Sequence, residues 1–445
     1  YPQFATHNAH TVAAVAELAQ LNPGRAFEFQ RLHGMGDALY DNLLSQDRVN
    51  VRIYAPVGAH KDLLPYLVRR LLENGANSSF VHRLVDAETP VSDLVQSPVA
   101  LASRHAVFRN PRIPRASEMF GTERSNSQGY NLSVAFEREP LLNSIRAFDD
   151  KQWSLKPIIN GKAADGGEKH PVLSPFDQRQ VVGDVTWTTA DQALEALGIA
   201  DTAWFKWNRT AVVERAACLD RMADLMEKHT DELMALCARE AGKSLQDSID
   251  EIREAVDFCR YYAQQARQNM ALPTALPGPT GESNEHYYEG RGVFLCISPW
   301  NFPLAIFMGQ VVAALVAGNT VLAKPAESTS LIAGRAIEML YEAGIPKDVL
   351  HYLPGSGATI GSALVPDSRV TGIAFTGSTE TAQLINRTLA EREGALATFI
   401  AETGGQNAMI VDSTALPEQV VADVMHSAFA SAGQRCSALR VLCVQ

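Results

Sequence analysis

Three side chains in the second half of the sequence could carry out acyl chemistry. Cys436 follows a turn at Gly433 and has polar, flexible neighbours, as a reactive thiolate requires. Glu402 ends one predicted strand and Asn301 ends another, so both side chains could enter a cleft. A thiol, a carboxylate and a carboxamide at the ends of parallel strands can act as nucleophile, general base and oxyanion donor.

The segment FTGSTETA (375–382) could bind an anion. A strand leads into Gly377 and Ser378 and then into a helix, so free N–H groups and the helix dipole could face a pyrophosphate. An ordinary capped helix start accounts for the same residues. The glycine-rich segment 355–361 is one residue too long for the dinucleotide fingerprint G-x-G-x-x-G, and a turn followed by a helix explains it as well.

Lys324 and Glu327 follow a predicted strand in the segment VLAKPAE (321–327). A ribose placed at the end of this strand could form hydrogen bonds with both side chains. The plainer interpretation is a surface ion pair between the two residues.

A helix predicted at 61–74 carries a polar stripe. Tyr66, Arg69, Arg70 and Glu73 stand at positions i, i+3, i+4 and i+7, on one face. The plain interpretation is a solvated stripe with an Arg69–Glu73 ion pair. The alternative is that the two guanidinium groups bind a carboxylate. Consecutive arginines diverge by about 100° on a helix, so both reach one ligand only if it lies over the seam between them.

The composition excludes several classes of protein. Hydrophobic residues make up 46% and charged residues 20% of the 445 residues, which is typical of a folded globular protein of about three domains. With 39 basic and 50 acidic residues the net charge is −11, which disfavours binding to nucleic acid or anionic lipid. The six cysteines form no C-x-x-C pair, which argues for a reducing, cytosol-like compartment and against a disulfide framework or a zinc site.

Two further features concern membranes and chain ends. The longest apolar stretch, 303–318, has 16 residues and contains Gln310, whereas a membrane span needs ~20, so a buried helix is predicted. No basic segment followed by an apolar run stands at the start, so no signal peptide is predicted. The sequence begins without Met in a strand pattern and stops in another at 440–445, and we interpret it as a piece of a longer protein.

Residues 1–86 alternate predicted strands with predicted helices. Three such units in a row indicate a parallel sheet, such as the end of a (β/α)8 barrel. His7, Asn8, Gln30 and Tyr54 lie at the carboxyl ends of these strands, where such folds keep their chemistry. The predicted strands are 4–8, 27–34 and 51–58, and the predicted helices are 10–20, 36–45 and 61–74, the last closed by Gly75.

Residues 87–150 change character, because prolines interrupt any period. A basic run lies here without interleaved aromatic residues, so packing and ion pairing with neighbouring acidic domains is favoured over nucleic-acid binding. We predict that this segment is a linker. The basic residues are Arg104, His105, Arg109, Arg112 and Arg115.

Residues 151–445 are predicted to form a second α/β unit. Strand and helix alternate at least five times after a Pro/Gly-rich bend at 272–281, which indicates a doubly wound sheet. The predicted strands are 292–298, 319–323, 349–353, 371–375, 398–402 and 407–411. The predicted helices are 190–200, 210–241, 244–270, 303–317, 329–343, 357–364, 379–391 and 417–430.

Five motifs in this region together resemble the aldehyde dehydrogenase superfamily. They are SPWNFP, KPAE, FTGS, ETGGQN and GQRCSA, and they occur in this order over residues 298–438. The resemblance implies that Cys436 attacks an aldehyde to give a thiohemiacetal whose oxyanion is held by the Asn301 amide and the Cys436 N–H. It also implies that hydride passes to NAD and that Glu402 activates the water that hydrolyses the thioester.

The same resemblance implies an NAD-binding domain at 151–403 and the start of a catalytic domain at 404–445. Lys324 and Glu327 would bind the adenosine ribose, and Gly377 with Ser378 the pyrophosphate. The full set of residues assigned to NAD is Ser298, Pro299, Trp300, Lys324, Glu327, Gly357, Gly361, Phe375, Thr376, Gly377, Ser378, Thr403 and Gly404.

The N-terminal region resembles the final strands and last helix of the proline dehydrogenase barrel. The segments concerned are YPQFATHNAHT (1–11), EFQRLHGMG (28–36), RIYAPVG (52–58) and YLVRRLLENGANSSFV (66–81). By this resemblance the residues that enclose proline are Arg69, Arg70, Tyr54, Tyr66 and Leu32. The residues that contact FAD are Thr6, His7, Asn8, Gln30 and Glu73.

Such a barrel, joined through FRNPRIPRASEMFG (108–121) to an aldehyde dehydrogenase, is similar to the bifunctional proline utilization A family. The resemblance implies oxidation of L-proline to pyrroline-5-carboxylate with FAD, and then of glutamate semialdehyde to L-glutamate with NAD. It also implies quinone as electron acceptor and a homo-oligomer formed through a hairpin, one strand of which would come from 272–290 and the other from beyond residue 445. The location implied is cytoplasmic, with peripheral contact at the inner face of a bacterial membrane.

Three other interpretations stay open at the level of sequence. The first is a stand-alone aldehyde dehydrogenase with an unrelated N-terminal appendage. The second is a DNA-binding regulator, although the DNA-binding arm of some relatives is not in this sequence. The third is a membrane-associated module, for which no basic amphipathic helix is seen.

Only about three of eight barrel units are present, and the sequence stops nine residues after Cys436, so we expect this chain by itself to be inactive.

Overall fold

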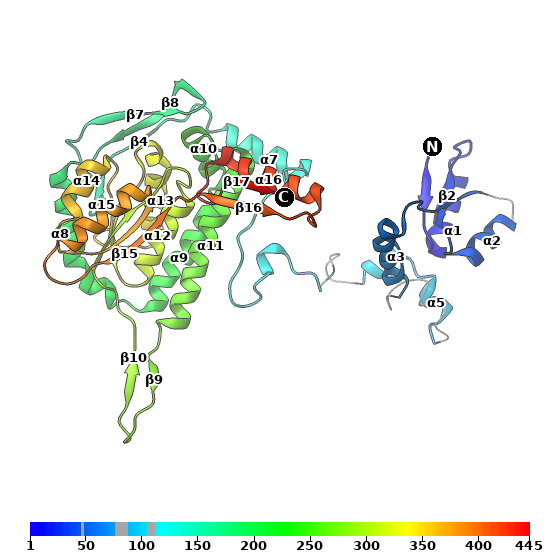
Figure 1. Ribbon diagram of the computed structural model, residues 1–445, viewed down its shortest axis with the longest axis horizontal. Coiled ribbons are helices and arrows are strands. Elements are labelled where there is room, and N and C mark those ends of the chain that lie inside the picture. The colour runs from blue at the N-terminus through cyan, green and yellow to red at the C-terminus, as the bar shows by residue number, and fades with distance from the viewer. Residues whose placement is uncertain (46–48, 76–87, 105–109, 111) are drawn as a thin grey trace. The chain divides into compact units, whose positions relative to one another are not determined.

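The computed structural model describes residues 1–45, 49–75, 88–104, 110 and 112–445. The chain divides into two compact units, Tyr1–Ile113 and Pro114–Gln445, each with a hydrophobic core of its own. The two units are described separately below (Figure 1).

The first unit contains three strand–helix repeats, as predicted. Its three strands are parallel in the order β1-β2-β3, so that Ala5 pairs with Gln30 and Leu32 pairs with Tyr54. A small core of Val12, Phe29 and Tyr40 lies beneath the sheet's helices. The elements are β1 (Gln3–Ala5), α1 (Ala9–Gln20), β2 (Glu28–Leu32), α2 (Asp37–Ser45), β3 (Asn50–Tyr54), α3 (His60–Gly75), α5 (Val91–Leu94) and α6 (Pro98–Ala102).

The predicted linker at 87–150 differs from the structure in its second half. Residues from Pro114 onward belong to the second compact unit, where α7 (Ala135–Arg146) buries Leu141 in the main core. Ser127 donates from its backbone N–H to Asp257 at 2.8 Å and from its hydroxyl at 2.7 Å. The prolines interrupt the helical period, but these long-range contacts fix the segment nonetheless. His105 and Arg109 of the basic run lie outside the described residues.

The second unit is built around a seven-stranded sheet with strand order β15-β14-β11-β12-β13-β5-β6. The first five strands of that order run parallel, which confirms the doubly wound prediction, and β5 and β6 extend it with antiparallel pairing. The strands are β11 (Val293–Ile297), β12 (Thr320–Lys324), β13 (Leu350–Tyr352), β14 (Val370–Gly377), β15 (Thr398–Thr403), β5 (Ile158–Ile159) and β6 (Lys162–Ala163).

The order of these strands contains a topological switch point. The chain adds β12 and β13 on one side of β11, and then returns to place β14 and β15 on the other side. The carboxyl ends of β11 and β14 therefore flank a crevice between helices that leave the sheet in opposite directions. Ligands of open α/β sheets bind in such a crevice.

Helices cover both faces of this sheet (Figure 1). One face carries α8, α14 and α15, whose apolar residues form one core cluster with the sheet. The other face carries α12 and α13, with α9, α10 and α11 packed outside them. The helices are α8 (Ala190–Asn208), α9 (Val212–Lys228), α10 (Thr230–Ala241), α11 (Leu245–Asn269), α12 (Ala305–Val316), α13 (Ser330–Glu342), α14 (Gly357–Leu364) and α15 (Thr379–Ala390).

The helix predicted at 210–241 is in fact two helices. The backbone leaves the helical region at His229, with φ −108° and ψ 29°, between α9 and α10. The Thr230 hydroxyl donates to the carbonyl of Glu227 at 2.8 Å, so a side chain takes a bond that the backbone would otherwise make. The apolar period continues through the break, which is why the sequence pattern did not reveal it.

Two small sheets were not predicted. Strands β4 (Trp153–Leu155), β8 (Asp177–Thr186) and β7 (Lys169–Ser174) form a separate sheet in that order. The bend after α11 forms a hairpin in which β9 (Thr274–Leu276) pairs antiparallel with β10 (Asn284–His286), and Figure 1 shows it projecting from the second unit. Only one strand was expected from this bend, whereas the bend supplies both strands of the hairpin. Pairing with a further strand beyond residue 445 stays a prediction.

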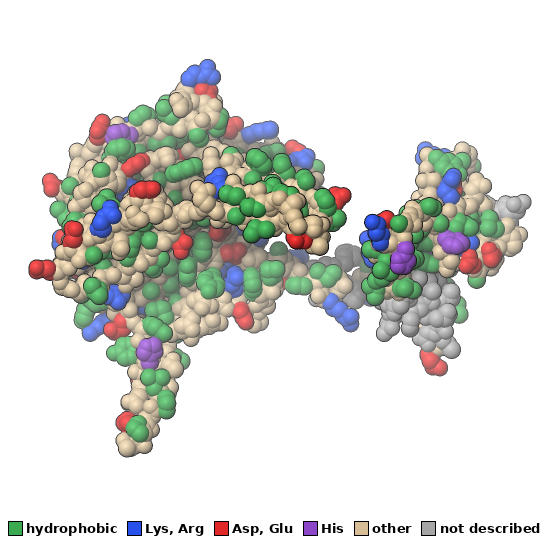
Figure 2. Space-filling model, in the orientation of Figure 1, with side chains coloured by type: hydrophobic (Ala, Val, Ile, Leu, Met, Phe, Trp, Pro, Cys, Tyr) green, Lys and Arg blue, Asp and Glu red, His purple; other side chains and the backbone are tan. Residues whose placement is uncertain are grey.

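The last residues form a separate layer. Strands β16 (Asn407–Val411) and β17 (Leu439–Val444) pair in parallel, connected through α16 (Pro417–Phe429) and the short helix η3 (Ala430–Gly433). No residue of α16 is buried, and Figure 2 shows hydrophobic side chains gathered over this part of the surface. Its exposed large apolar residues are Ile410, Leu416, Val421, Met425, Phe429, Val441, Leu442 and Val444.

No helix in the described part of the chain is both long enough and apolar enough to cross a membrane. The apolar stretch at 303–318 forms α12, which packs inside the second unit as predicted.

A buried histidine makes the stability of the second unit depend on pH. Burial lowers the pKa of His351 on β13 from 6.5 to about 4, opposed by the Asp348 carbonyl, while its Nδ1 accepts the Asn160 N–H at 3.1 Å. As the pH falls, the His351 imidazole is protonated in the unfolded state before it is protonated in the folded state. The contribution of neutral His351 to the free energy of unfolding is therefore complete above pH 6.5 and is lost as the pH falls toward 4. It amounts to about 3 kcal/mol.

We expect His351→Asn, which keeps an acceptor for the Asn160 N–H, to weaken this pH dependence. The free energy of unfolding can be measured with urea at pH 7 and pH 4.5. The difference in this free energy between the unmodified protein and the variant should be about 2 kcal/mol smaller at pH 4.5 than at pH 7. His286→Asn, at an exposed histidine of the hairpin, is the control and should leave the profile unchanged. Equal pH profiles for native protein and His351→Asn would contradict the prediction.

Candidate active site

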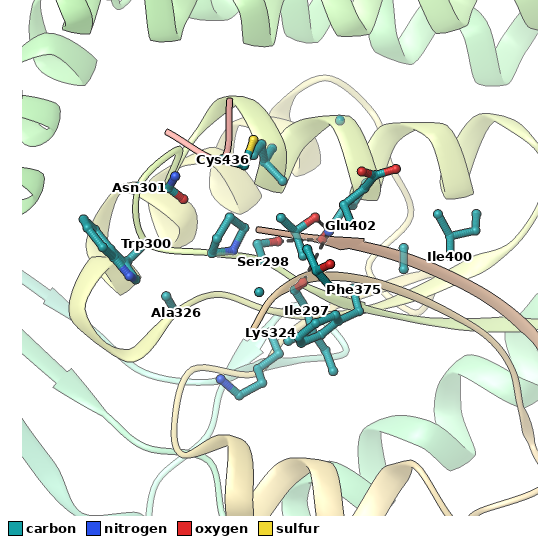
Figure 3. A pocket seen from close by; sticks show the side chains of 18 of the residues that line it. Ile297, Ser298, Trp300, Asn301, Lys324, Ala326, Phe375, Ile400, Glu402 and Cys436 are labelled. Carbon is teal, nitrogen blue, oxygen red and sulfur yellow. Dashed lines mark hydrogen bonds between the residues drawn. The ribbon is translucent and has the colours of Figure 1, made fainter. Parts of the chain in front are cut away.

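A large cavity lies at the switch point of the seven-stranded sheet. Its volume is about 1120 Å³, and its wall comes from the carboxyl ends of β11, β12, β14 and β15 and from the loop before β17. Figure 3 shows Cys436 and Asn301 at one end of this cavity and Lys324 at the other. The predicted residues that line it are Ser298, Pro299, Trp300, Asn301, Lys324, Glu327, Phe375, Thr376, Gly377, Ser378, Glu402, Thr403, Gly404 and Cys436.

Two of the residues predicted to contact NAD, Gly357 and Gly361, do not line the cavity. Gly357 is adjacent to it, because its N–H donates to Glu327 Oε1 at 2.8 Å at the start of α14. Gly361 lies one turn further along α14, and a side chain there would meet no atom within 4 Å. The plain interpretation of 355–361, a turn followed by a helix, describes what the structure shows at these two residues.

The thiol of Cys436 is exposed in the loop between η3 and β17. Ser431 and Ala432 both have φ of +55°, a left-handed conformation that non-glycine residues rarely adopt, and Gly433 follows with φ of +68°. The chain turns at these three residues, and the turn places the Cys436 thiol at the cavity. Asn407 Nδ2 donates to the Cys436 carbonyl at 2.6 Å and helps to hold the loop.

The remaining cysteines differ from Cys436 in their surroundings. Cys218, Cys237, Cys259 and Cys296 are buried, and desolvation raises the pKa of each thiol, that of Cys296 to about 12. Buried thiols that stay protonated are poor nucleophiles. Cys443 on β17 is exposed but does not line the cavity.

Asn301 and the thiol loop are joined directly. Asn301 Nδ2 donates to the carbonyl of Gln434, two residues before Cys436, at 2.8 Å. A primary amide has two N–H groups, so one hydrogen remains for a substrate oxygen. The contact holds the proposed oxyanion donor beside the proposed nucleophile.

Helix α11 supports both loops from behind, a role that the sequence did not reveal. Near the start of this helix, Asp247 forms an ion pair at 3.3 Å with Arg435, the residue directly before Cys436. One turn later the buried Glu251 accepts the N–H groups of Leu304 and Ala305 at 2.9 and 2.7 Å, at the start of α12. The carboxylate thereby caps the helix that follows Asn301.

The charge of Glu251 is balanced inside the protein. Lys243 Nζ lies 2.9 Å from Glu251 Oε2, and both side chains are buried. The Lys243 ammonium also lies 4.7 Å from the centroid of the Phe302 ring, next to Asn301. The spacing of Asp247 and Glu251, four residues apart on one helix face, was the available signal, but nothing local indicated their distant partners.

Glu402 is the second-to-last residue of β15 (Thr398–Thr403), which is the edge strand of the sheet. It stands opposite Thr376 in the parallel register between β14 and β15, so its position is set by the sheet. The side chain is exposed and lines the cavity with Cys436. A carboxylate with access to water suits a base that activates water.

The far end of the cavity contains the two residues predicted to bind a ribose, Lys324 and Glu327. Lys324 is buried, and its Nζ donates to the Pro325 carbonyl at 3.1 Å and lies 4.0 Å from Glu327 Oε1. Burial lowers the pKa of Lys324, and the charge of Glu327 opposes this effect. An ammonium has three N–H donors and Lys324 uses one toward Pro325, so it can also donate toward the cavity, beside a carboxylate that can accept ribose hydroxyls.

The segment at Gly377 and Ser378 forms the predicted helix cap, and its predicted role toward an anion stays open. Ser378 caps α15 by accepting the N–H of Thr381 at 3.2 Å, as an ordinary helix start would. Both residues also line the cavity at this helix N-terminus. The positive end of the α15 dipole therefore faces the cavity, as a pyrophosphate site requires.

The residues predicted to enclose proline lie close together in the first unit. The Tyr54 and Tyr66 ring centroids are 6.4 Å apart, and the Arg70 guanidinium lies 5.3 Å from the Tyr66 centroid. Arg69 is exposed on α3, and Leu32 pairs with Tyr54 in the sheet. The two tyrosines and Arg70 thus form one aromatic and cationic cluster.

The residues predicted to contact FAD hold the ends of β1 and β2. The Asn8 side chain caps α1 by accepting the His10 N–H at 2.9 Å, and the Thr6 hydroxyl accepts the Asn8 N–H at 3.1 Å. His7 Nε2 accepts the Leu32 N–H at 3.1 Å, and Gln30 Nε2 donates to Glu28 at 3.4 Å. The side chain of Glu73 lies outside the described residues. The role of all five toward FAD stays a prediction.

Each of the two compact units contains a match to a known family. Residues 162–445 match the aldehyde dehydrogenase family, and residues 1–83 match proline dehydrogenase. The chain is 48% identical, over all of its length, to the bifunctional protein PutA of Salmonella typhimurium, and 49% identical to that of Rhizobium meliloti. It covers 34% and 35% of those proteins, so it spans about a third of the length of the curated relatives it matches.

Solved structures agree with these matches. A crystal structure of Bradyrhizobium japonicum proline utilization A aligns with the whole chain at a TM-score of 0.81 and 49% identity, and the chain covers 42% of it. That of Bdellovibrio bacteriovorus aligns at a TM-score of 0.87 and 35% identity, with 46% covered. The chain therefore belongs to the aldehyde dehydrogenase family, and it carries a proline dehydrogenase segment before that domain, as PutA proteins do.

Proposed function

We propose that the chain is part of a bifunctional enzyme that oxidises L-proline to L-glutamate. The observation that carries the second step is that Cys436, Asn301 and Glu402 line one cavity with Lys324 and Glu327. The match of residues 1–83 to proline dehydrogenase supports the first step, and it argues against an unrelated N-terminal appendage.

In the aldehyde step, the Cys436 thiolate forms a bond to the carbonyl carbon of glutamate semialdehyde. The negative charge that develops on the carbonyl oxygen is held by the Asn301 amide and the Cys436 N–H. NAD, when bound, supplies the acceptor for the hydride that leaves this carbon. The product of that step is a thioester on Cys436.

Release of L-glutamate requires water. Glu402 takes a proton from the attacking water, the new C–O bond forms, and the C–S bond breaks to regenerate the Cys436 thiolate. The exposure of Glu402 at the edge of the sheet supports this role, because the base must exchange protons with solvent.

In the proline step, the chain's residues bind and orient the substrate. The guanidinium groups of Arg69 and Arg70 bind the proline carboxylate, and Tyr54, Tyr66 and Leu32 enclose its ring. FAD, when bound, supplies the hydride acceptor. Pyrroline-5-carboxylate then takes up water and opens to glutamate semialdehyde, the substrate of the second step.

The resemblance to proline utilization A supports further parts of the proposal. They are quinone as the acceptor of electrons from the flavin, a homo-oligomeric state, and a cytoplasmic location with peripheral contact at the inner face of a bacterial membrane. The net charge of −11 favours small substrates over nucleic acid as partners.

The test is to purify the protein that contains this chain and to measure its visible absorption and both activities. We expect a bound-flavin spectrum, proline-dependent reduction of an artificial acceptor, and formation of NADH from pyrroline-5-carboxylate. Aldehyde oxidation without flavin or proline oxidation would support a plain aldehyde dehydrogenase instead. A protein that shows neither activity and does not bind NAD would overturn the proposal.

A further inference from the structure

We propose that Gln310 is a positioning residue that directs the hydroxyl groups of Ser298 and Thr376 toward a dinucleotide at the switch point. The inference rests on the proposed function, because it names the residue that organises the same site. Gln310 is the polar residue of the otherwise apolar helix α12, and its side chain lines the cavity.

The Gln310 carboxamide links the ends of two adjacent strands. Ser298, directly after β11, donates from its hydroxyl to Gln310 Oε1 at 2.8 Å. Gln310 Nε2 donates to Thr376 Oγ1 on β14 at 2.9 Å and to the Ile297 carbonyl on β11 at 3.3 Å. These strands pair in parallel, with Ile297 opposite Phe375, and their ends flank the switch point. One side chain therefore spans the floor of the crevice in which α/β sheets bind ligands.

The Ile297 carbonyl determines which way the carboxamide faces. A carbonyl oxygen can only accept a hydrogen bond, so the amide nitrogen must lie toward it and the amide oxygen toward Ser298. The two N–H groups of Gln310 are then both used, one by Ile297 and one by Thr376. This orientation follows from the neighbours and leaves no second arrangement that satisfies all three contacts.

The direction of these bonds decides what the two hydroxyls offer to the cavity. Because Thr376 Oγ1 already accepts from Gln310, its own hydrogen must be donated elsewhere, and the described residues provide no acceptor for it. Because Ser298 donates to Gln310, its lone pairs remain free to accept. Both residues line the cavity, so Thr376 presents a donor there and Ser298 an acceptor.

This pattern suits the dinucleotide. Thr376 directly precedes Gly377 and the N-terminus of α15, so its hydroxyl adds a donor beside the N–H groups that face an anionic or carbonyl oxygen. In the absence of Gln310 each hydroxyl would be free to rotate and to pair with the other or with water. Gln310 thus orients the two hydroxyl groups before NAD binds. Its loss should therefore raise the NAD dissociation constant rather than lower the rate of the chemical step.

The test is Gln310→Met, which keeps the length of the side chain and removes its hydrogen bonds. In the protein that contains this chain, we expect the NAD dissociation constant, measured by fluorescence titration, to rise about tenfold. The KM for NAD should rise in parallel, with kcat for aldehyde oxidation changed less than about threefold. The matched control is Gln264→Met, because Gln264 is also a buried amide but bonds Glu123 away from the cavity.

A double-mutant cycle with Thr376→Val separates positioning from general loss of structure. If Gln310 acts partly through the Thr376 hydroxyl, Gln310→Met should weaken NAD binding less in a protein with Thr376→Val than in the unmodified protein, because only the effect through Ser298 remains. Independent, multiplying effects would overturn the proposal, as would a dissociation constant within twofold of the unmodified protein. An unmodified protein that binds no NAD would instead refute the proposed function itself.

Should Gln310→Met fold poorly, two substitutions at Thr376 decide the matter. Thr376→Ser keeps the hydroxyl and should bind NAD nearly as well as the unmodified protein. Thr376→Val removes it and should bind about tenfold more weakly. Equal binding by the two variants would overturn the inference.

Discussion

In the protein that contains this chain, replacing Cys436 with serine is expected to lower aldehyde oxidation by about 10⁴- to 10⁶-fold, because the covalent step is lost while the rest of the cavity remains. The hydroxyl of serine is far less acidic than a thiol, and among the described residues that line the cavity there is no histidine to activate it. The rate of NADH formation at saturating pyrroline-5-carboxylate measures this loss. NAD binding should be preserved within about threefold, since the Lys324 end of the cavity is unchanged.

The chain offers a close control for this experiment. Cys443 is the other exposed cysteine, and it lies on β17 outside the cavity wall. Cys443→Ser should therefore retain full activity, and iodoacetamide should still inactivate it by alkylating Cys436. A Cys436→Ser variant that retained more than a tenth of the activity would show that another group is the nucleophile.

Replacing both Arg69 and Arg70 with methionine is expected to abolish proline oxidation selectively. Each charge-assisted hydrogen bond to a carboxylate contributes about 1.5–3 kcal/mol, so loss of both should lower kcat/KM for proline by about 10²- to 10⁴-fold. Methionine preserves the apolar stem of each side chain on α3 and so limits damage to packing. The measurement is proline-dependent reduction of an artificial acceptor across a range of proline concentrations.

NADH formation from pyrroline-5-carboxylate should be unchanged in this variant, because the aldehyde site is built from the second unit. Lys61→Met is the matched control, since Lys61 is an exposed cation in the first turn of the same helix. It should leave both activities intact. Loss of aldehyde oxidation in the double variant would indicate a general folding defect, and unchanged proline oxidation would refute the assignment of the two arginines.

Local sequence patterns were sufficient to predict the sheet and the composition of the candidate site. Glu402 and Asn301 were predicted from polar residues that follow apolar strands, and Cys436 from the polar, flexible neighbours of a glycine turn. The structure places all three on the wall of one cavity. Parallel strands of one sheet bring Glu402 and Asn301 to a common edge. Cys436 was also expected at a strand end, but it lies in the loop before β17. The three strand–helix repeats of residues 1–75 were predicted on the same local basis.

Contacts between distant residues were not predicted, because no local period records them. The Asn301 amide meets a carbonyl 133 residues away, and Arg435 meets an aspartate 188 residues away. The sequence did contain one signal for Gln310, a polar side chain within an apolar stretch, which requires a buried partner. Only the packed structure identifies Ser298, Ile297 and Thr376 as those partners.

The sequence by itself therefore determined the strand–helix order, the doubly wound class of the sheet and the chemical types at the candidate active site. The tertiary structure alone decided where the helix at His229 breaks, that the bend after α11 pairs with itself, and how the two loops around Asn301 and Cys436 are joined. The physical reason is the range of the interactions. Turn, cap and periodicity signals act within a few residues, whereas packing and buried hydrogen bonds depend on partners that only the fold brings together.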